Sequence, residues 1–155
     1  MFEPSLEKDG EVVAQKEEEH MPLIQWEDRF SVGIRKLDQQ HKGLVGMINE
    51  LHDAMKAGKG QEVVSEIVQR LAAYAKNHFS SEEELFDLHG YPEAARHRQE
   101  HALLVEKVAQ WQRDLQVGRK GITIEVAHFL RNWLTNHILE SDKRYGPFLN
   151  AKGVQ

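Results

Sequence analysis

The sequence predicts an all-α protein that folds as an antiparallel up-down-up-down four-helix bundle with an irregular N-terminal segment. Apolar residues recur every three or four positions along four long stretches, which is the period of a helix that buries one face. Glycines and prolines separate these stretches, and no stretch alternates like a half-buried strand. With 155 residues, the chain has the length of one domain with one core.

Residues 1–20 differ from the rest of the chain in charge. They contain seven acidic and two basic residues and so carry the whole formal net charge of −5, whereas the remaining residues hold 18 of each sign. We interpret residues 1–20 as an acidic, disordered leader that is either an added extension or an upstream start. Met21 follows directly, so we expect the bundle to occupy residues 21–155.

The helix boundaries follow from capping and breaking residues. After an irregular segment that begins at Pro22, Asp38 is the expected N-cap of the first helix. Gly90 is expected to end the second helix, and Pro92 to stand near the first position of the third. Gly146 follows the fourth. We expect helices over residues 38–57, 61–89, 92–117 and 122–145.

Nine histidines are the unusual feature of the composition. Projected at 100° per residue, five of them continue the apolar stripes, and Glu82 joins them one turn after the second. These five are His41, His78, His97, His101 and His137. They come early on the odd helices and late on the even ones, which is the same end of an antiparallel bundle. One inward histidine is usually a hydrogen-bonded core residue, but five need a shared partner, and a metal is the simplest.

The other histidines do not fit this layer. His128 lies half a turn opposite His137 and faces outward, and His89 stands at a helix C-terminus, where an imidazolium favours the dipole. His20 belongs to the leader. His52 lies about 16 Å from the layer, and we interpret it as a packing or solvent-edge residue.

The donor types indicate iron. The chain has no cysteine, and nitrogen and oxygen donors without sulfur suit two iron ions bridged by carboxylates. Glu82 is one candidate bridge and Asp142 the other. On a regular α-helix, however, Asp142 points 140° away from His137. We therefore predict a π-type bulge or an unwound turn near Leu139–Ser141.

Four motifs combine into a family signature. In order, they are Leu37-Asp38-Gln39-Gln40-His41-Lys42, His78-x-x-x-Glu82, His97-x-x-x-His101 and His137-x-x-x-x-Asp142. Together they resemble the hemerythrin family over about residues 22–149. The flanking residues resemble its single-domain bacterial branch, the bacteriohemerythrins: Ser31-Val32-Gly33-Ile34, Tyr91-Pro92, Trp133-Leu134-x-Asn136-His137-Ile138 and Asp142-x-x-Tyr145.

The resemblance implies a reversible oxygen-binding protein rather than an enzyme, serving oxygen transport, storage or delivery to oxygen-requiring enzymes. It implies two iron ions per chain and no haem. One ion would take His97, His101 and His137, and the other His41 and His78. Glu82, Asp142 and a solvent-derived oxo or hydroxo group would bridge the two ions, and dioxygen would bind at the second. The alternatives are an oxygen- or redox-sensing module and a di-iron oxidase or peroxidase.

Apolar residues that point inward near this layer are candidates for the lining of an oxygen pocket, and core packing is their simultaneous role. They are Leu44, Val45, Leu104, Trp133, Leu134 and Ile138. An apolar, dry pocket would supply no spare acid. Gly43 and Gly46 are expected to let the first helix approach its neighbour closely.

Composition limits the partners. A pI near 6.0 with a negative net charge argues against a nucleic-acid partner, which favours a basic face. No apolar run approaches the roughly 20 residues of a membrane helix. We expect a cytoplasmic monomer that binds dioxygen and passes it to a recipient enzyme that the sequence does not identify.

Overall fold

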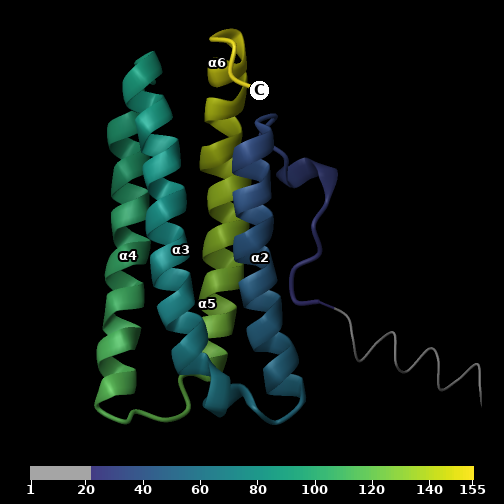
Figure 1. Ribbon diagram of the computed structural model, residues 1–155, viewed down its shortest axis with the longest axis vertical. Helices are drawn as coiled ribbons and strands as arrows, with labels where there is room; N and C mark the ends of the chain where they lie inside the picture. The colour runs from purple at the N-terminus through teal and green to yellow at the C-terminus, as the bar shows by residue number, and fades with distance from the viewer. Residues whose placement is uncertain (1–21) are drawn as a thin grey trace, which may run out of the picture.

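The computed structural model describes residues 22–155, so the leader predicted for residues 1–20 lies outside the described residues. The elements are η1 (Asp28–Phe30), α2 (Arg35–Lys56), α3 (Gly60–His89), α4 (Ala94–Gln116), α5 (Thr123–Asn136), η2 (His137–Asp142) and α6 (Lys143–Ala151). The last three run on as one rod, so the chain forms four antiparallel rods joined by short loops (Figure 1). The predicted all-α four-helix bundle is confirmed.

The first helix begins earlier than predicted, at Arg35, and Asp38 is not its N-cap. The carboxylate of Asp38 instead faces back toward the N-terminal arm, which we define as residues 22–34. Its Oδ1 accepts a hydrogen bond from the Val32 N–H at 2.8 Å, and its Oδ2 accepts one from the Ser31 hydroxyl at 2.6 Å. The Asp38 carboxylate, which was expected to cap the helix, therefore accepts hydrogen bonds from the arm instead.

The boundaries of the third and fourth rods also differ from the prediction. Pro92 stands in the turn before α4, not inside the helix. The fourth rod continues through Pro147 to Ala151, although proline removes one backbone hydrogen bond from the helix. Two fully buried side chains flank this proline, Tyr145 and Leu149, and their burial offsets the loss.

Two glycines allow close approach between elements. A Cβ at Gly146 would collide with the Val32 carbonyl oxygen, so α6 can touch the arm only without a side chain there. A Cβ at Gly43 would collide with Tyr74 Oη on α3, as the predicted close packing requires. The same expectation for Gly46 is wrong, because nothing lies within 4 Å of its Cβ position.

The predicted irregularity in the fourth rod is confirmed. The π-helix η2 spans His137–Asp142 and so contains the turn in which a bulge was expected. It fits one more residue into the turn than an α-helix would, so a spacing of five residues returns to the same face. Asp142 is fully buried as a result, not solvated.

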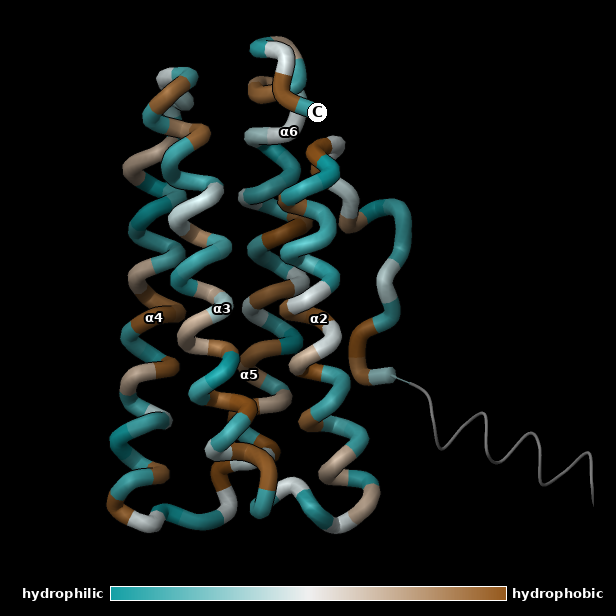
Figure 2. Tube along the Cα trace, in the orientation of Figure 1, coloured by the Kyte–Doolittle hydropathy of each residue, from teal (hydrophilic) through white to brown (hydrophobic). Residues whose placement is uncertain are grey.

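The apolar core has two parts, one on each side of a polar layer. The larger cluster fills the space between all four rods, where the hydrophobic positions of the tubes face one another (Figure 2). The smaller cluster lies at the end where α2 begins and consists of Val32, Ile34, Leu37, Phe86, Tyr91, Tyr145 and Leu149. Within residues 22–155, no helix is both long enough and apolar enough to cross a bilayer.

Candidate metal centre

The structure brings all seven predicted ligand residues together in one layer between the two apolar clusters. Every one of them is buried, with exposed fractions of 0–6 %. Every rod contributes: His41 from α2, His78 and Glu82 from α3, His97 and His101 from α4, and His137 and Asp142 from η2. The seven residues therefore lie at the same level along the bundle, as predicted from their positions on antiparallel helices.

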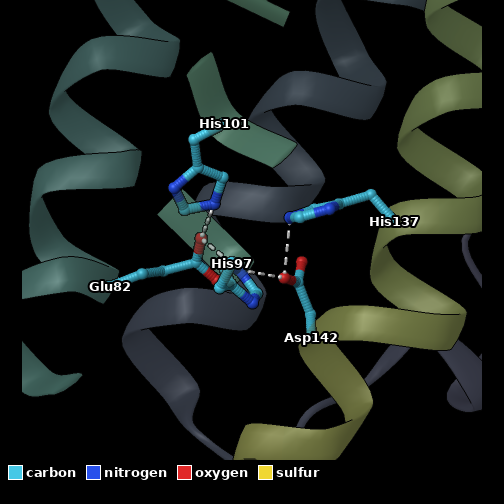
Figure 3. Close-up of side chains that lie close together, drawn as sticks. All are labelled: Glu82, His97, His101, His137 and Asp142. Atoms are coloured by element: carbon cyan, nitrogen blue, oxygen red, sulfur yellow. Dashed lines mark ion pairs between the residues drawn. The ribbon is translucent and has the colours of Figure 1, made fainter. Parts of the chain in front are cut away.

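Three histidines face both carboxylates, and we call this group the three-histidine pocket: His97, His101 and His137 with Glu82 and Asp142 (Figure 3). One ligand atom of each residue lies within 4.8 Å of all the others. Glu82 Oε1 is 3.1 Å from His101 Nε2 and 3.7 Å from His97 Nε2. Asp142 Oδ1 is 3.0 Å from Nε2 of both His97 and His137.

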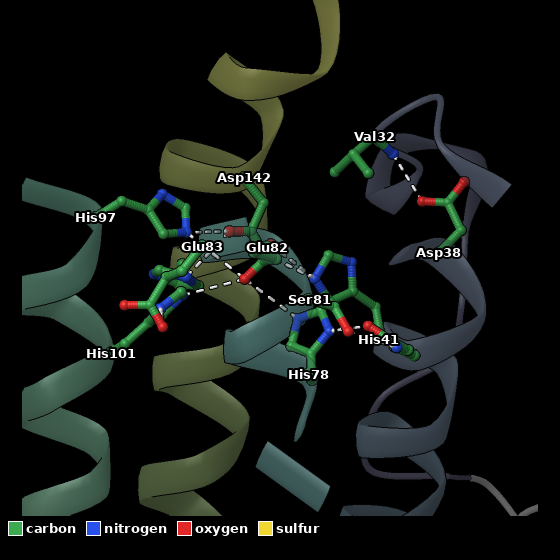
Figure 4. Close-up of polar contacts among 12 residues, drawn as sticks. Val32, Asp38, His41, His78, Ser81, Glu82, Glu83, His97, His101 and Asp142 are labelled. Carbon is green, nitrogen blue, oxygen red and sulfur yellow. Dashed lines mark hydrogen bonds and ion pairs between the residues drawn. The ribbon is translucent and has the colours of Figure 1, made fainter. Parts of the chain in front are cut away.

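His41 and His78 form a second group with Glu82, which we call the two-histidine pocket. His78 Nε2 is 3.3 Å from Glu82 Oε1, and His41 Nε2 is 3.8 Å from Glu82 Oε2. Asp142 Oδ2 is 2.9 Å from His41 Nε2 (Figure 4). Asp142 thus turns one oxygen toward each pocket, and Glu82 contacts histidines of both, which is the arrangement of two carboxylates that bridge neighbouring cations.

The inward atoms of this layer have no aligned hydrogen-bond partner among the described residues. They are the Nε2 atoms of His41, His97, His101 and His137 and both carboxylate oxygens of Glu82 and of Asp142. Each unpaired buried polar group costs about 1–3 kcal/mol, so a shared partner such as a cation would stabilise this layer. Donors about 2.1 Å from an ion are about 3 Å apart when they subtend a right angle, which matches the shortest nitrogen–oxygen separations here. The donor set therefore fits two cations, and nitrogen and oxygen without sulfur suit iron.

The layer is electrostatically coupled. Burial lowers the pKa of His41, but the Asp142 and Glu82 carboxylates together outweigh it and raise that pKa from 6.5 to about 10. The pKa of His97 is raised to about 9, because the carboxylates of Asp142 at 3.0 Å and Glu82 at 3.7 Å together outweigh burial. For His78 burial prevails and lowers the pKa to about 4. In metal-free protein the carboxylates thus favour the protonated forms of His41 and His97, and entering cations must displace those protons.

Both carboxylates stay ionised despite full burial. Burial alone would raise the pKa of Glu82, but the surrounding imidazoles, with His78 foremost, hold it well below its usual range. Burial and the neighbouring Glu82 likewise raise the pKa of Asp142, and His137 and His41 outweigh both, so this pKa is also lowered. The layer thus presents anionic oxygens to a cation at neutral pH.

The remaining histidines lie outside both pockets, as predicted for the described ones. His128 is exposed on α5. His52 and His89 are half-buried and belong to neither group of candidate ligands. His20 lies outside the described residues. The projection of the sequence onto helices thus separated inward from outward histidines correctly.

Aromatic rings that contact the ligand histidines were missed by the sequence reasoning. Phe79 stacks on His101 with ring centroids 3.8 Å apart and planes inclined by 9°. Trp133, predicted only as pocket lining, stacks on His137 at 4.4 Å and 15°. Their positions in the sequence could have indicated these contacts, because Phe79 directly follows His78 and Trp133 precedes His137 by one turn. These contacts fix the planes of two imidazoles.

Partners of the outer ring nitrogens were also missed. Gln40 Oε1 lies 2.6 Å from His78 Nδ1, and Glu100 Oε2 lies 2.9 Å from His137 Nδ1. Both partners directly precede a predicted ligand in the chain, His41 and His101 respectively. A search for acceptors adjacent to ligands would have found them, because a ligating histidine usually donates its second ring nitrogen to such a group.

The predicted oxygen-pocket residues all belong to the larger apolar cluster. Five of them are buried there, namely Leu44, Val45, Leu104, Leu134 and Ile138, and Trp133 is half-buried at its edge. Core packing is thus established for them, and a role in lining a pocket for oxygen is part of the proposal below.

Comparison with known proteins agrees with this geometry. Residues 32–149 match the family profile described as Hemerythrin HHE cation binding domain. A bacteriohemerythrin of Methylococcus capsulatus is 36% identical over 132 residues, which cover 84% of this chain and 100% of that protein. A bacteriohemerythrin of Stenotrophomonas maltophilia is 34% identical over 131 residues, 84% of each chain. A crystal structure of wild-type hemerythrin superposes with a TM-score of 0.76 at 34% identity, covering 82% of this chain and 98% of that one.

Proposed function

The chain belongs to the hemerythrin family, and we propose that it binds dioxygen reversibly at a non-haem di-iron centre. The observation that carries the proposal is the buried layer of histidines and carboxylates whose inward atoms lack partners. Residues of the family motif occupy this layer, and their donor types suit iron. The relatives from Stenotrophomonas maltophilia and Methylococcus capsulatus are named bacteriohemerythrins.

The two pockets define which residues would hold which ion. The three-histidine pocket would hold one iron through His97, His101 and His137. The two-histidine pocket would hold the other through His41 and His78. Glu82 and Asp142 would bridge the ions, aided by an oxo or hydroxo group from solvent. The two-histidine pocket offers one histidine fewer than the three-histidine pocket, and dioxygen would bind on that side of the layer.

When both ions are bound in the ferrous state, they supply one electron each to dioxygen. The protein's own residues would hold the ions and limit the supply of protons. Among residues 22–155, Glu82 and Asp142 are the only buried carboxylates, and both serve as proposed ligands. No further buried carboxylic acid is therefore at hand to deliver the protons that reduction of dioxygen to water requires, and burial raises the pKa of the Tyr145 phenol beside Glu82 well above its usual range. This restriction favours reversible binding over catalysis.

The apolar residues next to the layer support the same role. Leu44, Val45 and Leu134 are at most 6 % exposed, and with Leu104, Trp133 and Ile138 they would keep water from the oxygen site. We propose that the protein works as a monomer in the cytoplasm, as a carrier, a store or a supplier of oxygen to an enzyme. Gel filtration and cell fractionation test these two assignments.

Iron analysis combined with visible spectroscopy tests the proposed function. Protein reconstituted without oxygen is expected to hold two irons per chain and to be colourless when reduced. It should become coloured in air and lose the colour again under vacuum, over repeated cycles. Steady consumption of oxygen in the presence of a reductant would instead identify an oxidase. Fewer than two irons, or no response to air, would refute the proposal.

A further inference from the structure

The histidines of the two pockets differ in the groups that contact their outer ring nitrogens, the Nδ1 atoms that point away from the pocket. In the two-histidine pocket, the outer nitrogen of His78 meets a neutral amide, that of Gln40, and the outer nitrogen of His41 has no partner among the described residues. In the three-histidine pocket, the outer nitrogen of His137 lies 2.9 Å from the Glu100 carboxylate, whereas that of His101 is 3.9 Å from the Glu83 carboxylate, beyond hydrogen-bond distance. This contrast lies outside the metal ligands themselves.

A directed chain of hydrogen bonds fixes the amide of Gln40. The Ser81 hydroxyl donates to the backbone carbonyl of Asn77 at 3.1 Å, so its oxygen is left as an acceptor. Gln40 Nε2 donates to that oxygen at 3.3 Å, which turns Oε1 toward His78. His78 Nδ1 must therefore carry the proton, and its Nε2 presents a lone pair to the pocket.

Carboxylates occupy the corresponding positions in the three-histidine pocket. Glu100 Oε2 lies 2.9 Å from His137 Nδ1, and Arg96 approaches the other oxygen of Glu100 to 3.8 Å. Glu83 Oε2 lies 3.9 Å from His101 Nδ1, and Arg98 lies 3.3 Å from Glu83 Oε1. Arg98 therefore holds Glu83 near the imidazole, and Arg96 does the same less closely for Glu100.

We propose that the two pockets bind their cations with unequal strength, in a fixed order, with the three-histidine pocket filling first. Gln40 and Glu100 act as positioning residues that set part of this difference through the rings of His78 and His137. The inference rests on the proposed two-metal site. It goes beyond that proposal in ranking the two cations and in assigning the ranking to residues that touch neither of them.

Two physical effects give the order. A carboxylate that accepts the Nδ1 proton makes the opposite nitrogen a stronger donor to a metal than an amide does, because the negative charge stabilises positive charge on the ring. The three-histidine pocket also offers five converging ligand residues, against four in the two-histidine pocket once the bridging Asp142 is counted for both. Both effects favour the same pocket, and neither requires a redox change.

Titration of metal-free protein with Zn²⁺ tests the order, because zinc accepts the same donors and has no redox chemistry. Calorimetry is expected to resolve two steps. In ¹⁵N spectra of the imidazoles, the first equivalent should shift the resonances of His97, His101 and His137, and the second those of His41 and His78. Filling in one step, or a first equivalent that shifts the second set, would overturn the proposal.

Two variants test the positioning residues. Glu100→Gln is expected to weaken the first step by about 10–100-fold. Gln40→Glu should strengthen the second step by a similar factor and so reduce the difference in metal affinity between the two steps. The matched control is Glu50→Gln, which removes an exposed carboxylate bound to Arg70 at 3.0 Å and contacts no ligand histidine, and it should change neither step.

The outcomes separate this proposal from the proposed function. If Glu100→Gln fails to fold, the order in the wild-type spectra and the response of Gln40→Glu still decide. An unchanged second step in Gln40→Glu would overturn the role of Gln40. Ordered binding of zinc without any oxygen response of the iron form would refute the oxygen-binding function and leave the order standing. Reversible oxygen binding by the iron form without ordered zinc binding would refute the order alone.

Discussion

Replacing Asp142 by asparagine removes one negative charge from the centre of the layer while keeping the shape of the side chain. The carboxylate is fully buried and lies 2.9–3.0 Å from the Nε2 atoms of His41, His97 and His137. It is also the proposed bridge that turns one oxygen toward each pocket. The substitution therefore weakens both metal positions at once, and we expect the variant to lose iron.

The expected size follows from these distances. Two unit charges 3 Å apart in a medium of effective dielectric constant 20 interact by about 5–6 kcal/mol. Removing one partner of a buried, paired charge costs about 3–5 kcal/mol in practice. At about 1.4 kcal/mol for each factor of ten, Asp142→Asn should lower the affinity for metal by about 10²–10⁴-fold.

The assay is a competition for iron against a chelator of known affinity, followed by metal analysis of the protein. Glu140→Gln is the matched control, because it removes an exposed charge from the same π-helix and should leave affinity unchanged. In metal-free protein, an NMR titration of Asp142→Asn should show the pKa of His41 falling from about 10 toward its ordinary 6.5.

Two results would refute this reasoning. If Asp142→Asn kept two irons with the affinity of the wild type, the assignment of Asp142 as a bridge would be wrong. If His41 titrated near pH 10 in the variant as well, the raised pKa of this histidine would have another cause. A loss of iron in the Glu140→Gln control would show that the π-helix, not the carboxylate, had been disturbed.

Three further predictions concern the metal-free protein and the packing. Metal-free protein should lose stability as the pH rises from 6.5 toward 10, because folding raises the pKa of His41 and His97 and that stabilisation is complete only below 6.5; equal urea midpoints at pH 6.5 and 9.5 would contradict it. Gly43→Ala should cost about 1–3 kcal/mol, since its Cβ would collide with Tyr74 Oη, and additivity with Tyr74→Phe in a double-mutant cycle would exclude that collision. Deleting the exposed Glu140 should give a continuous α-helix that keeps His137 and Asp142 on one face, about 40° apart, so iron binding should be retained. Loss of iron in a chelator competition would contradict this.

Most of the fold and the candidate site could be predicted from the chain because both depend on helical periodicity. His97 and His101 stand one turn apart on an apolar stripe, and this places them on one face whatever the neighbouring helices are. The π-helix was predictable for a different reason. The five-residue spacing from His137 to Asp142 fits a shared site only if the helix widens.

The boundaries of helices were less predictable because capping depends on what lies nearby in space. Asp38 is a good N-cap by residue type, but its carboxylate binds the arm at Val32 and Ser31, so the helix begins at Arg35 without a side-chain cap. Pro147 marks a helix end by residue type too. The burial of its neighbours carries the last rod past it.

By itself, the sequence determined the four-helix bundle, the inward set of five histidines and two carboxylates, and the need for a widened turn. These depend on residue types and on spacing along one helix, which are local properties of the chain. Only the tertiary structure decided what stands behind each imidazole. Gln40 on α2 meets His78 on α3, and Glu100 on α4 meets His137 on η2. Such contacts depend on how two rods are rotated against each other, and no spacing within a single rod encodes that rotation.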